Sequence, residues 1–204
     1  MKPVCLIAPY AAWMILMAAL PATAAMYALR SAVTAAVLLW AVWKSGLFSD
    51  GRGAMAQAVS NRGNWSWGII GGIAVLVIWT APENFSWYRQ YFIMGDVPVS
   101  GSSPYDPAVC GWALTVAKLF GSAFVISAAE ELFFRKWLVG FAGFWWMVAL
   151  FAVEHDRPAV AAAAGAIYGL IALRRGMFSA ILAHAVTNLL LGFWIIYSGN
   201  WAFW

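Results

Sequence analysis

The amino-acid sequence predicts an all-α integral membrane protein, a polytopic bundle of about seven transmembrane helices. Of its 204 residues, 64% are hydrophobic and only 10% are charged, whereas a soluble domain carries about 25% charged residues. Apolar runs of about 16 to 20 residues recur along the chain, close to the helix length that crosses a hydrocarbon core of about 30 Å. Because a lone strand cannot satisfy its backbone in lipid, each run is predicted to be a helix.

The predicted helices follow one another and are separated by breaks rich in polar residues, glycine and proline. They cover residues 4–20, 23–43, 66–81, 109–139, 144–155, 158–173 and 177–198. The stretch 82–107 differs, because it carries several prolines and aromatic residues. We expect it to be a loop that lies partly in the membrane interface. Together the segments predict a single integral membrane domain over residues 1–204.

The first hydrophobic segment has two interpretations. Lys2, the apolar run after it and the small residues after Pro21 could form a secretory signal with a cleavage site. The apolar run begins almost at once, however, and another hydrophobic segment follows it. We therefore favour a retained first helix over cleavage.

The basic residues predict the orientation of the chain and the class of partner. The net charge is +4, but lysine and arginine occur singly or in pairs at the ends of apolar runs, and no basic patch for nucleic acid exists. With the N-terminus inside, only Arg89 and Arg157 fall on the outer face. Arg30 and Lys118 lie within spans, where we expect them to pair or to extend toward the interface. These patterns predict a multi-pass membrane protein, whose partner is the lipid bilayer and not nucleic acid.

Polar and ionisable groups gather in the late spans, where they are costly and tend to mark function. These groups are Glu130, Glu131, Arg135, His155, His184 and Asn188. At 1.5 Å per residue, Glu130, His155 and His184 lie about 14, 18 and 12 Å from the same membrane face. Asn188 is one helical turn beyond His184 on the same face. We therefore expect three helices to bring their polar groups to a similar depth.

The residue types favour acid–base chemistry on water. A buried glutamate beside a second carboxylate, such as Glu130, can accept a proton from water. Glu131 and Arg135 are four residues apart and should pair along the helix, which leaves Glu130 free. His155 could orient the same water or pass on the proton. Donors to the oxyanion of a tetrahedral intermediate could come from the last span, which carries the neighbours His184 and Asn188.

Three motifs occur in order on the late helices: Glu-Glu-x-x-x-Arg at 130–135, Phe-x-x-x-His at 151–155 and His-x-x-x-Asn at 184–188. Together they resemble the motifs of the CAAX-protease and bacteriocin-processing (CPBP) family. That family contains type II CAAX prenyl endopeptidases and is described as glutamic-type intramembrane proteases. The resemblance covers residues 109–198, and the run Gly165-Ala-Ile-Tyr-Gly169 also fits it. One departure is Glu154, because the place before the histidine is commonly small or apolar.

The resemblance implies an intramembrane endopeptidase that cleaves a membrane-anchored or C-terminal-signal-bearing protein or peptide without a cofactor. The roles that it implies are a catalytic glutamate at Glu130, a water-activating partner at His155, an oxyanion pair at His184 and Asn188, and supporting positions at Glu131 and Arg135. In the first half, Pro9-Tyr10 and Trp43-Lys44 are similar to a bacterial branch of the family associated with C-terminal sorting signals of the exosortase kind.

Other interpretations of the same residues stay open. Glu130, His155 and His184 could hold zinc in a metalloprotease, although no His-Glu-x-x-His signature supports this. The polar groups could also belong to a non-catalytic protein, such as a proton-coupled transporter, an immunity protein or a scaffold. In a purely structural role they would be an ion pair and hydrogen bonds between helices.

Overall fold

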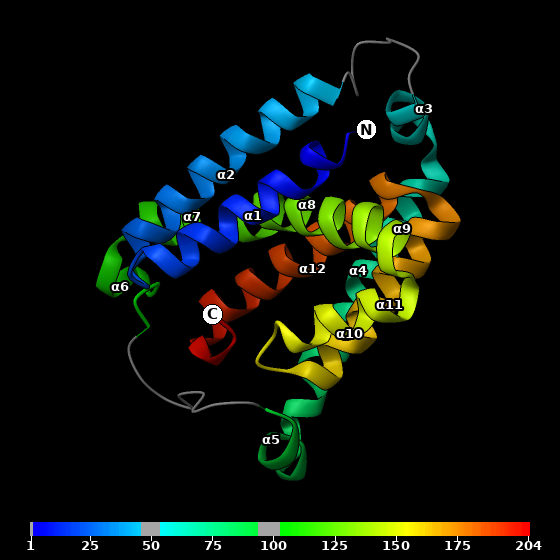
Figure 1. The fold of residues 1–204 in the computed structure, drawn as a ribbon. Coiled ribbons are helices and arrows are strands. Elements are labelled where there is room, and N and C mark those ends of the chain that lie inside the picture. The colour runs from blue at the N-terminus through cyan, green and yellow to red at the C-terminus, as the bar shows by residue number, and fades with distance from the viewer. Residues whose placement is uncertain (1, 46–53, 94–102) are drawn as a thin grey trace.

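The computed structural model describes residues 2–45, 54–93 and 103–204, and its regular structure there is helical throughout (Figure 1). The first half contains α1 (Pro3–Ala19), α2 (Ala24–Ser45), α3 (Ala54–Ser60), α4 (Arg62–Thr80), the 3-10 helix η1 (Ala81–Asn84), α5 (Ser86–Phe92) and α6 (Pro107–Cys110). One long helix follows, made of α7 (Trp112–Phe120), the π-helix η2 (Gly121–Ile126), α8 (Ser127–Glu130), the π-helix η3 (Glu131–Leu138) and α9 (Val139–Ala142). The chain then forms α10 (Phe144–Val153), α11 (Pro158–Arg175), α12 (Met177–Ser198) and the 3-10 helix η4 (Trp201–Phe203). The predicted all-α class is confirmed.

All seven predicted hydrophobic segments form helices, but the number of transmembrane helices was overestimated. Among the described residues, four helical stretches are long and apolar enough to cross a membrane: Ala24–Ser45, Arg62–Asn84, Trp112–Ala142 and Met177–Ser198. The 10 residues of α10 span about 15 Å, half of a hydrocarbon core, and α1 has only 17 residues. The α11 helix ends in two arginines, which shortens its apolar part. Four such helices indicate a multi-pass membrane protein.

The predicted loop over residues 82–107 is partly helical. Ser86–Phe92 forms α5, and Pro82 and Pro107 each lie in the first turn of a short helix. Proline is tolerated there because its missing N–H would have no partner within the helix. Residues 94–102 of this stretch lie outside the described residues, as does the segment 46–53 of the predicted break between the second and third spans.

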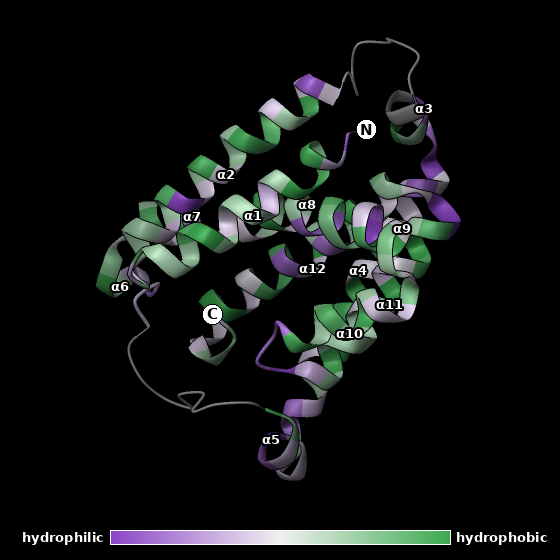
Figure 2. Ribbon diagram, in the orientation of Figure 1, coloured by the Kyte–Doolittle hydropathy of each residue, from purple (hydrophilic) through white to green (hydrophobic). Residues whose placement is uncertain are grey.

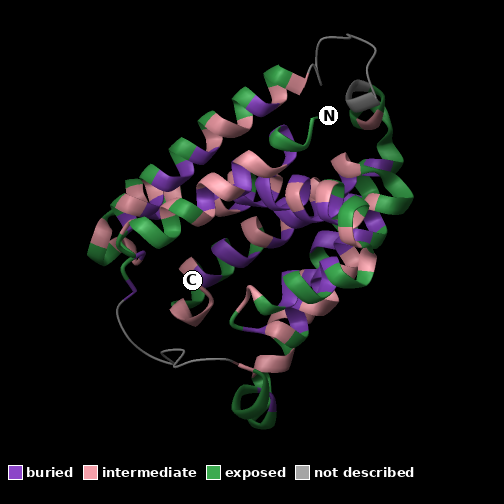
Figure 3. Ribbon diagram, in the orientation of Figure 1, coloured by how far each residue is buried: buried purple, intermediate pink, exposed green. Residues whose placement is uncertain are grey.

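The polarity of the surface agrees with a membrane environment. Large apolar side chains point outward along the helices, and Leu39 and Trp145 are 71% and 76% exposed. Hydrophilic segments lie at the ends of α2 and α11, at α5 and at the loop after α10 (Figure 2). Further hydrophilic residues lie inside the bundle, on the long helix and on α12, where Figure 3 shows the buried residues concentrated. The exposed apolar surface therefore fits contact with lipid, and the interior polar residues need another explanation.

Glycines allow the late helices to turn and to approach one another. Gly143 and Gly176 have φ angles of 93° and 87°, which other residues rarely adopt, and they join α9 to α10 and α11 to α12. Gly169 packs against α10, since a Cβ there would lie 2.7 Å from the ring of Phe144. Close packing also occurs at Gly165, which faces Phe151. These contacts hold α10 and α11 together beside the buried polar residues.

Candidate active site

Glu130 lies at a change of helical geometry in the long helix. It ends the short α8, which has the π-helix Gly121–Ile126 before it and the π-helix Glu131–Leu138 after it. Wide turns of this kind are rare in proteins and frequently occur at functional sites. The hydrophobic pattern of the sequence does not distinguish them from ordinary α-helix, so the sequence did not predict them.

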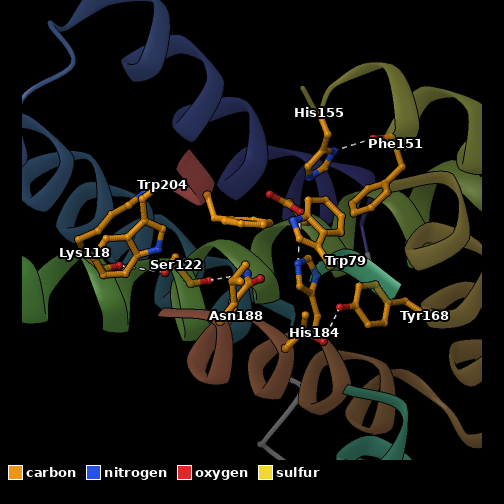
Figure 4. Close-up of a pocket in the computed structure, with 13 residues that line it drawn as sticks. Trp79, Lys118, Ser122, Phe151, His155, Tyr168, His184, Asn188 and Trp204 are labelled. Atoms are coloured by element: carbon orange, nitrogen blue, oxygen red, sulfur yellow. Dashed lines mark hydrogen bonds and ion pairs between the residues drawn. The ribbon is translucent and has the colours of Figure 1, made fainter. Parts of the chain in front are cut away.

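Residues from all three predicted motifs line one central cavity of about 240 Å³ (Figure 4). Glu130 comes from the long helix, His155 from the loop after α10, and His184 and Asn188 from α12. The remaining lining residues are Trp79, Lys118, Ser122, Phe151, Tyr168, Thr187, Leu191, Phe203 and Trp204. The expected meeting of polar groups from three helices is therefore present in the structure.

Glu131 is the centre of a buried ionic cluster beside the cavity. Its Oε1 lies 3.2 Å from Nη1 of Arg135, and both side chains are completely buried. The predicted pair along the helix is thus present. The same Oε1 accepts a hydrogen bond from Nδ1 of His184 at 2.9 Å. Glu131 and Arg135 do not line the cavity, so they act on it through His184.

The guanidinium of Arg135 is enclosed by aromatic rings as well as by Glu131. Its Cζ lies 4.1 Å from the ring centroid of Phe151, 5.4 Å from that of Tyr168 and 5.6 Å from that of Phe134. Such contacts stabilise a cation that has lost its hydration. Arg135 is therefore a fixed positive charge next to the carboxylates.

Glu130 presents a free carboxylate oxygen to this cluster. Its side chain is 10% exposed, and Oε2 has no hydrogen-bond partner within the described residues. Nε2 of His184 lies 3.8 Å from this oxygen. That separation is too long for a direct hydrogen bond, but one oxygen atom could be hydrogen-bonded to both groups.

His184 is held in one orientation by neighbours on two other helices. Its Nδ1 donates to Glu131, and its ring stacks on Tyr168 with centroids 4.7 Å apart. The Tyr168 hydroxyl donates to Oγ1 of Thr187 at 2.7 Å. Tyr168 lies within the Gly-Ala-Ile-Tyr-Gly run that fits the family resemblance, and its contacts give this run a role in orienting the imidazole.

His155 lies in the apex loop (residues 154–157), outside the four long apolar helices. Its Nδ1 donates to the carbonyl oxygen of Phe151 at 2.8 Å, and its ring contacts those of Phe151 and Trp79. Burial lowers the pKa of His155 to about 4, because the charged form loses its hydration. At neutral pH its Nε2 is therefore unprotonated and can accept a hydrogen bond.

The hydrogen bonds that Asn188 makes in the structure differ from the predicted donation to an oxyanion. Its Nδ2 donates to the carbonyl oxygen of Ser122 at 3.1 Å and to Oγ of Ser127 at 3.0 Å. Both amide hydrogens therefore tie α12 to the long helix. Donation to an oxyanion stays a prediction, and it requires Asn188 to exchange one of these bonds.

The contacts of two residues in the apex loop, Glu154 and Arg157, were not predicted from the sequence. The Tyr10 hydroxyl donates to the carboxylate of Glu154 across 144 positions. Burial raises the pKa of the Glu154 carboxyl, and the Tyr10 hydrogen bond opposes that shift. In the same loop, Arg157 forms an ion pair with Glu83. The signal that could have exposed Glu154 is its position directly before the histidine of the second motif.

A zinc site is not formed by the candidate ligands in their present positions. In residues 2–45, 54–93 and 103–204, no three His, Cys, Asp or Glu side chains are grouped so that they could hold a metal ion. The alternative ligand set, Glu130, His155 and His184, therefore does not fit a metal centre with this geometry.

No family model, curated protein or solved structure was found to match this chain. The resemblance of its three motifs to those of the glutamic intramembrane proteases stays a hypothesis. Its physical support is the single cavity that residues from these motifs share.

Proposed function

We propose that this chain is an intramembrane endopeptidase that hydrolyses a peptide bond with a water activated by Glu130 and His155. The observation that carries the proposal is the convergence of Glu130, His155 and His184 on one cavity inside a bundle of apolar helices. Ionisable groups are rarely placed at membrane depth without a function. A carboxylate and two imidazoles are groups that can move protons near neutral pH.

Two protonation states leave the cluster of Glu130, Glu131, Arg135 and His184 without net charge. Glu130 is protonated and His184 is neutral in the first, and Glu130 is ionised and His184 is doubly protonated in the second. The mechanism uses the second state, which one proton transfer from Glu130 to His184 produces. In this state Glu130 can accept a proton, and the Nε2–H of His184 can donate a hydrogen bond.

Hydrolysis proceeds in two steps in this mechanism. A water donates hydrogen bonds to Glu130 and to the unprotonated Nε2 of His155. Glu130 takes a proton while the water oxygen bonds to the carbonyl carbon of the substrate, and His184 donates to the oxyanion that forms. Glu130 then gives its proton to the amide nitrogen, the C–N bond breaks, and a carboxylic acid and an amine leave.

The substrate class and location follow from the resemblance to the CPBP family and from the membrane helices. A membrane-anchored protein or peptide, or a protein with a C-terminal sorting signal, would present its scissile bond to a cavity within the bundle. The proposed location is the bacterial inner membrane.

The decisive test is Glu130→Gln, which keeps the shape of the side chain but cannot accept the proton. We expect cleavage of a model single-span peptide by the purified protein in detergent to fall at least about 10²-fold. The matched control is Asp156→Asn, since Asp156 is an exposed carboxylate next to His155. Unchanged thermal unfolding of both variants would show that folding is intact. Cleavage by Glu130→Gln at the wild-type rate would refute the proposal.

A second candidate function is proton-coupled transport. The observation that favours it is the position of the His184 imidazole between the carboxylates of Glu130 and Glu131. Carboxylates and histidines in sequence are also what intramembrane proton relays use. Protein reconstituted in vesicles with an internal pH indicator separates the two functions. Proton flux without peptide cleavage would favour transport, and cleavage without flux would favour the protease.

A further inference from the structure

The cavity has a further ionisable group, a lysine, at the end away from Glu130. Lys118 of α7 lines the same cavity, and Figure 4 shows it beside Trp204, with Ser122 and Asn188 between it and His184. Its Nζ lies 3.9 Å from the ring centroid of Tyr27, 4.7 Å from that of Tyr105 and 5.7 Å from that of Trp204. We call this group of residues the cationic end.

Lys118 has no carboxylate partner within the described residues, although the sequence had suggested that it pairs or extends to the interface. The charged side chain near it is another cation, Arg30, which is 4% exposed and close enough to repel it. Nη2 of Arg30 donates to the carbonyl oxygens of Leu20 and Pro21, at 2.7 and 2.5 Å, and so binds the end of α1. Arg30 therefore adds positive charge and does not neutralise Lys118.

The aromatic rings offset only part of the cost of keeping this lysine out of water. Their faces attract a cation, but they carry no net negative charge. An ammonium group that faces a cavity without a carboxylate beside it can be neutralised by an anion that enters the cavity. Lysine is suited to this role because it is a compact point charge on a flexible stem.

We propose that Lys118 binds a carboxylate of the peptide substrate, and this inference rests on the proposed function. Glu130 follows Lys118 by twelve positions in one continuous helix, and six of these positions form the π-helix Gly121–Ile126, so the α-helical rise of 1.5 Å per residue gives an upper limit of about 18 Å. An extended peptide covers about 3.3 to 3.6 Å per residue. The bound carboxylate therefore lies at most about five residues along the substrate from the bond that is hydrolysed. Its source is either the C-terminus of the peptide or an acidic side chain.

The test measures binding without turnover, using the full chain with Glu130→Gln in detergent. The probes are three fluorescent peptides with an alanine–leucine span of about 20 residues and an uncharged tail of about five residues. The first ends in a free carboxylate, the second in an amide, and the third in an amide with one glutamate in the tail. We expect a carboxylate at either place to lower Kd about tenfold or more relative to the uncharged peptide.

Lys118→Met should abolish this preference, and Lys118→Arg should retain it because the charge remains. The matched control is Lys136→Met, since Lys136 is exposed on the same long helix and does not line the cavity. Preference for the free C-terminus alone identifies a terminal carboxylate, and preference for the glutamate peptide alone identifies a side chain. Equal benefit from both supports a carboxylate of either origin.

Equal Kd values for the three peptides would overturn the inference, as would a preference that survives Lys118→Met or an absence of binding. The peptide comparison needs no change at Lys118, so it remains informative if Lys118→Met does not fold. The two proposals also fail separately. A carboxylate preference that depends on Lys118, with no cleavage of any peptide by the wild-type chain, would leave the binding site in place and refute the protease.

Discussion

A cation lies at or beside each end of the cavity, but the two differ in how their charge is matched. Arg135 lies 3.2 Å from Glu131, which also accepts a hydrogen bond from His184, so charge is matched within the protein. Lys118 instead faces the rings of Tyr27, Tyr105 and Trp204 and has no carboxylate partner in the described chain. The comparison teaches that charge is organised in advance where bonds would be broken and left incomplete where a ligand would bind.

The two ends also come from different parts of the chain. The acidic end, Glu130, His155 and His184, comes from α8, the apex loop and α12, all within the region that carries the three motifs. The cationic end combines Lys118 with Tyr27 of α2, Tyr105 before α6 and Trp204 after η4. The proposed chemistry is therefore concentrated in neighbouring late segments, whereas the proposed recognition site depends on segments that are distant in sequence.

The largest effect should come from breaking the matched charges with Arg135→Met. Glu131 would remain as a completely buried carboxylate without its cation, and we expect the free energy of unfolding to fall by about 3–5 kcal/mol. Lys118→Met leaves no carboxylate unpaired and should cost less than about 2 kcal/mol, the scale of its cation–π contacts. Reversible unfolding in detergent measures both values. The double variant Arg135→Met with Glu131→Gln should recover part of the loss, and equal losses for the two single variants would contradict the comparison.

At the acidic end, His155→Ala should lower the cleavage rate about 10²-fold. The side chain donates one hydrogen bond, to the Phe151 carbonyl, and its ring contacts those of Phe151 and Trp79, so thermal unfolding of the variant is measured beside its activity. Because burial lowers its pKa to about 4, the neutral form that accepts a proton prevails above that pH and is lost below it. Initial rates of the wild type should therefore show no step near 6.5 that disappears in His155→Ala. Such a step would mean that His155 is an ordinary, solvated histidine.

Asn188 lies between the two ends of the cavity, and Asn188→Ala tests its role there. Loss of the bonds to Ser122 and Ser127 should lower the free energy of unfolding by about 1 kcal/mol, the usual size for hydrogen bonds between membrane helices. Ser127→Ala removes one of these bonds and is the matched control. If Asn188 also donates to the oxyanion, its variant should lose at least about 10² in kcat beyond the control. Equal kcat values for the two variants would leave Asn188 with a positioning role only.

The smallest expected effect is that of chelation. Water activated by Glu130 and His155 needs no metal ion, and we expect cleavage to survive dialysis against a chelator. Metal analysis of the active protein, together with assays before and after dialysis, measures this. Lost activity that returns only with added zinc would mean that Glu130, His155 and His184 move together into a ligand set.

Local sequence features predicted the parts of the fold that depend on neighbours along the chain. Hydropathy located all seven hydrophobic segments, and the spacing of Glu131 and Arg135 indicated their ion pair, because helix periodicity places such residues on one face. Counting residues from the turns placed Glu130, His155 and His184 at similar depth, and they line one cavity. The count of transmembrane helices was wrong because hydropathy identifies apolar segments but does not show whether a helix is long enough to cross a membrane. The helix α10 has only 10 residues, and two arginines at its end shorten the apolar part of α11.

The sequence by itself determined the membrane class, the order of helices and the identity of the polar groups, since these follow from composition and from spacing within single helices. The tertiary structure alone decided which side chains from distant segments are in contact. The Tyr10 bond to Glu154 joins residues 144 positions apart, and the rings around Lys118 come from three separate segments. Contacts of this kind depend on how helices pack and rotate against one another, which no periodicity within a single helix specifies.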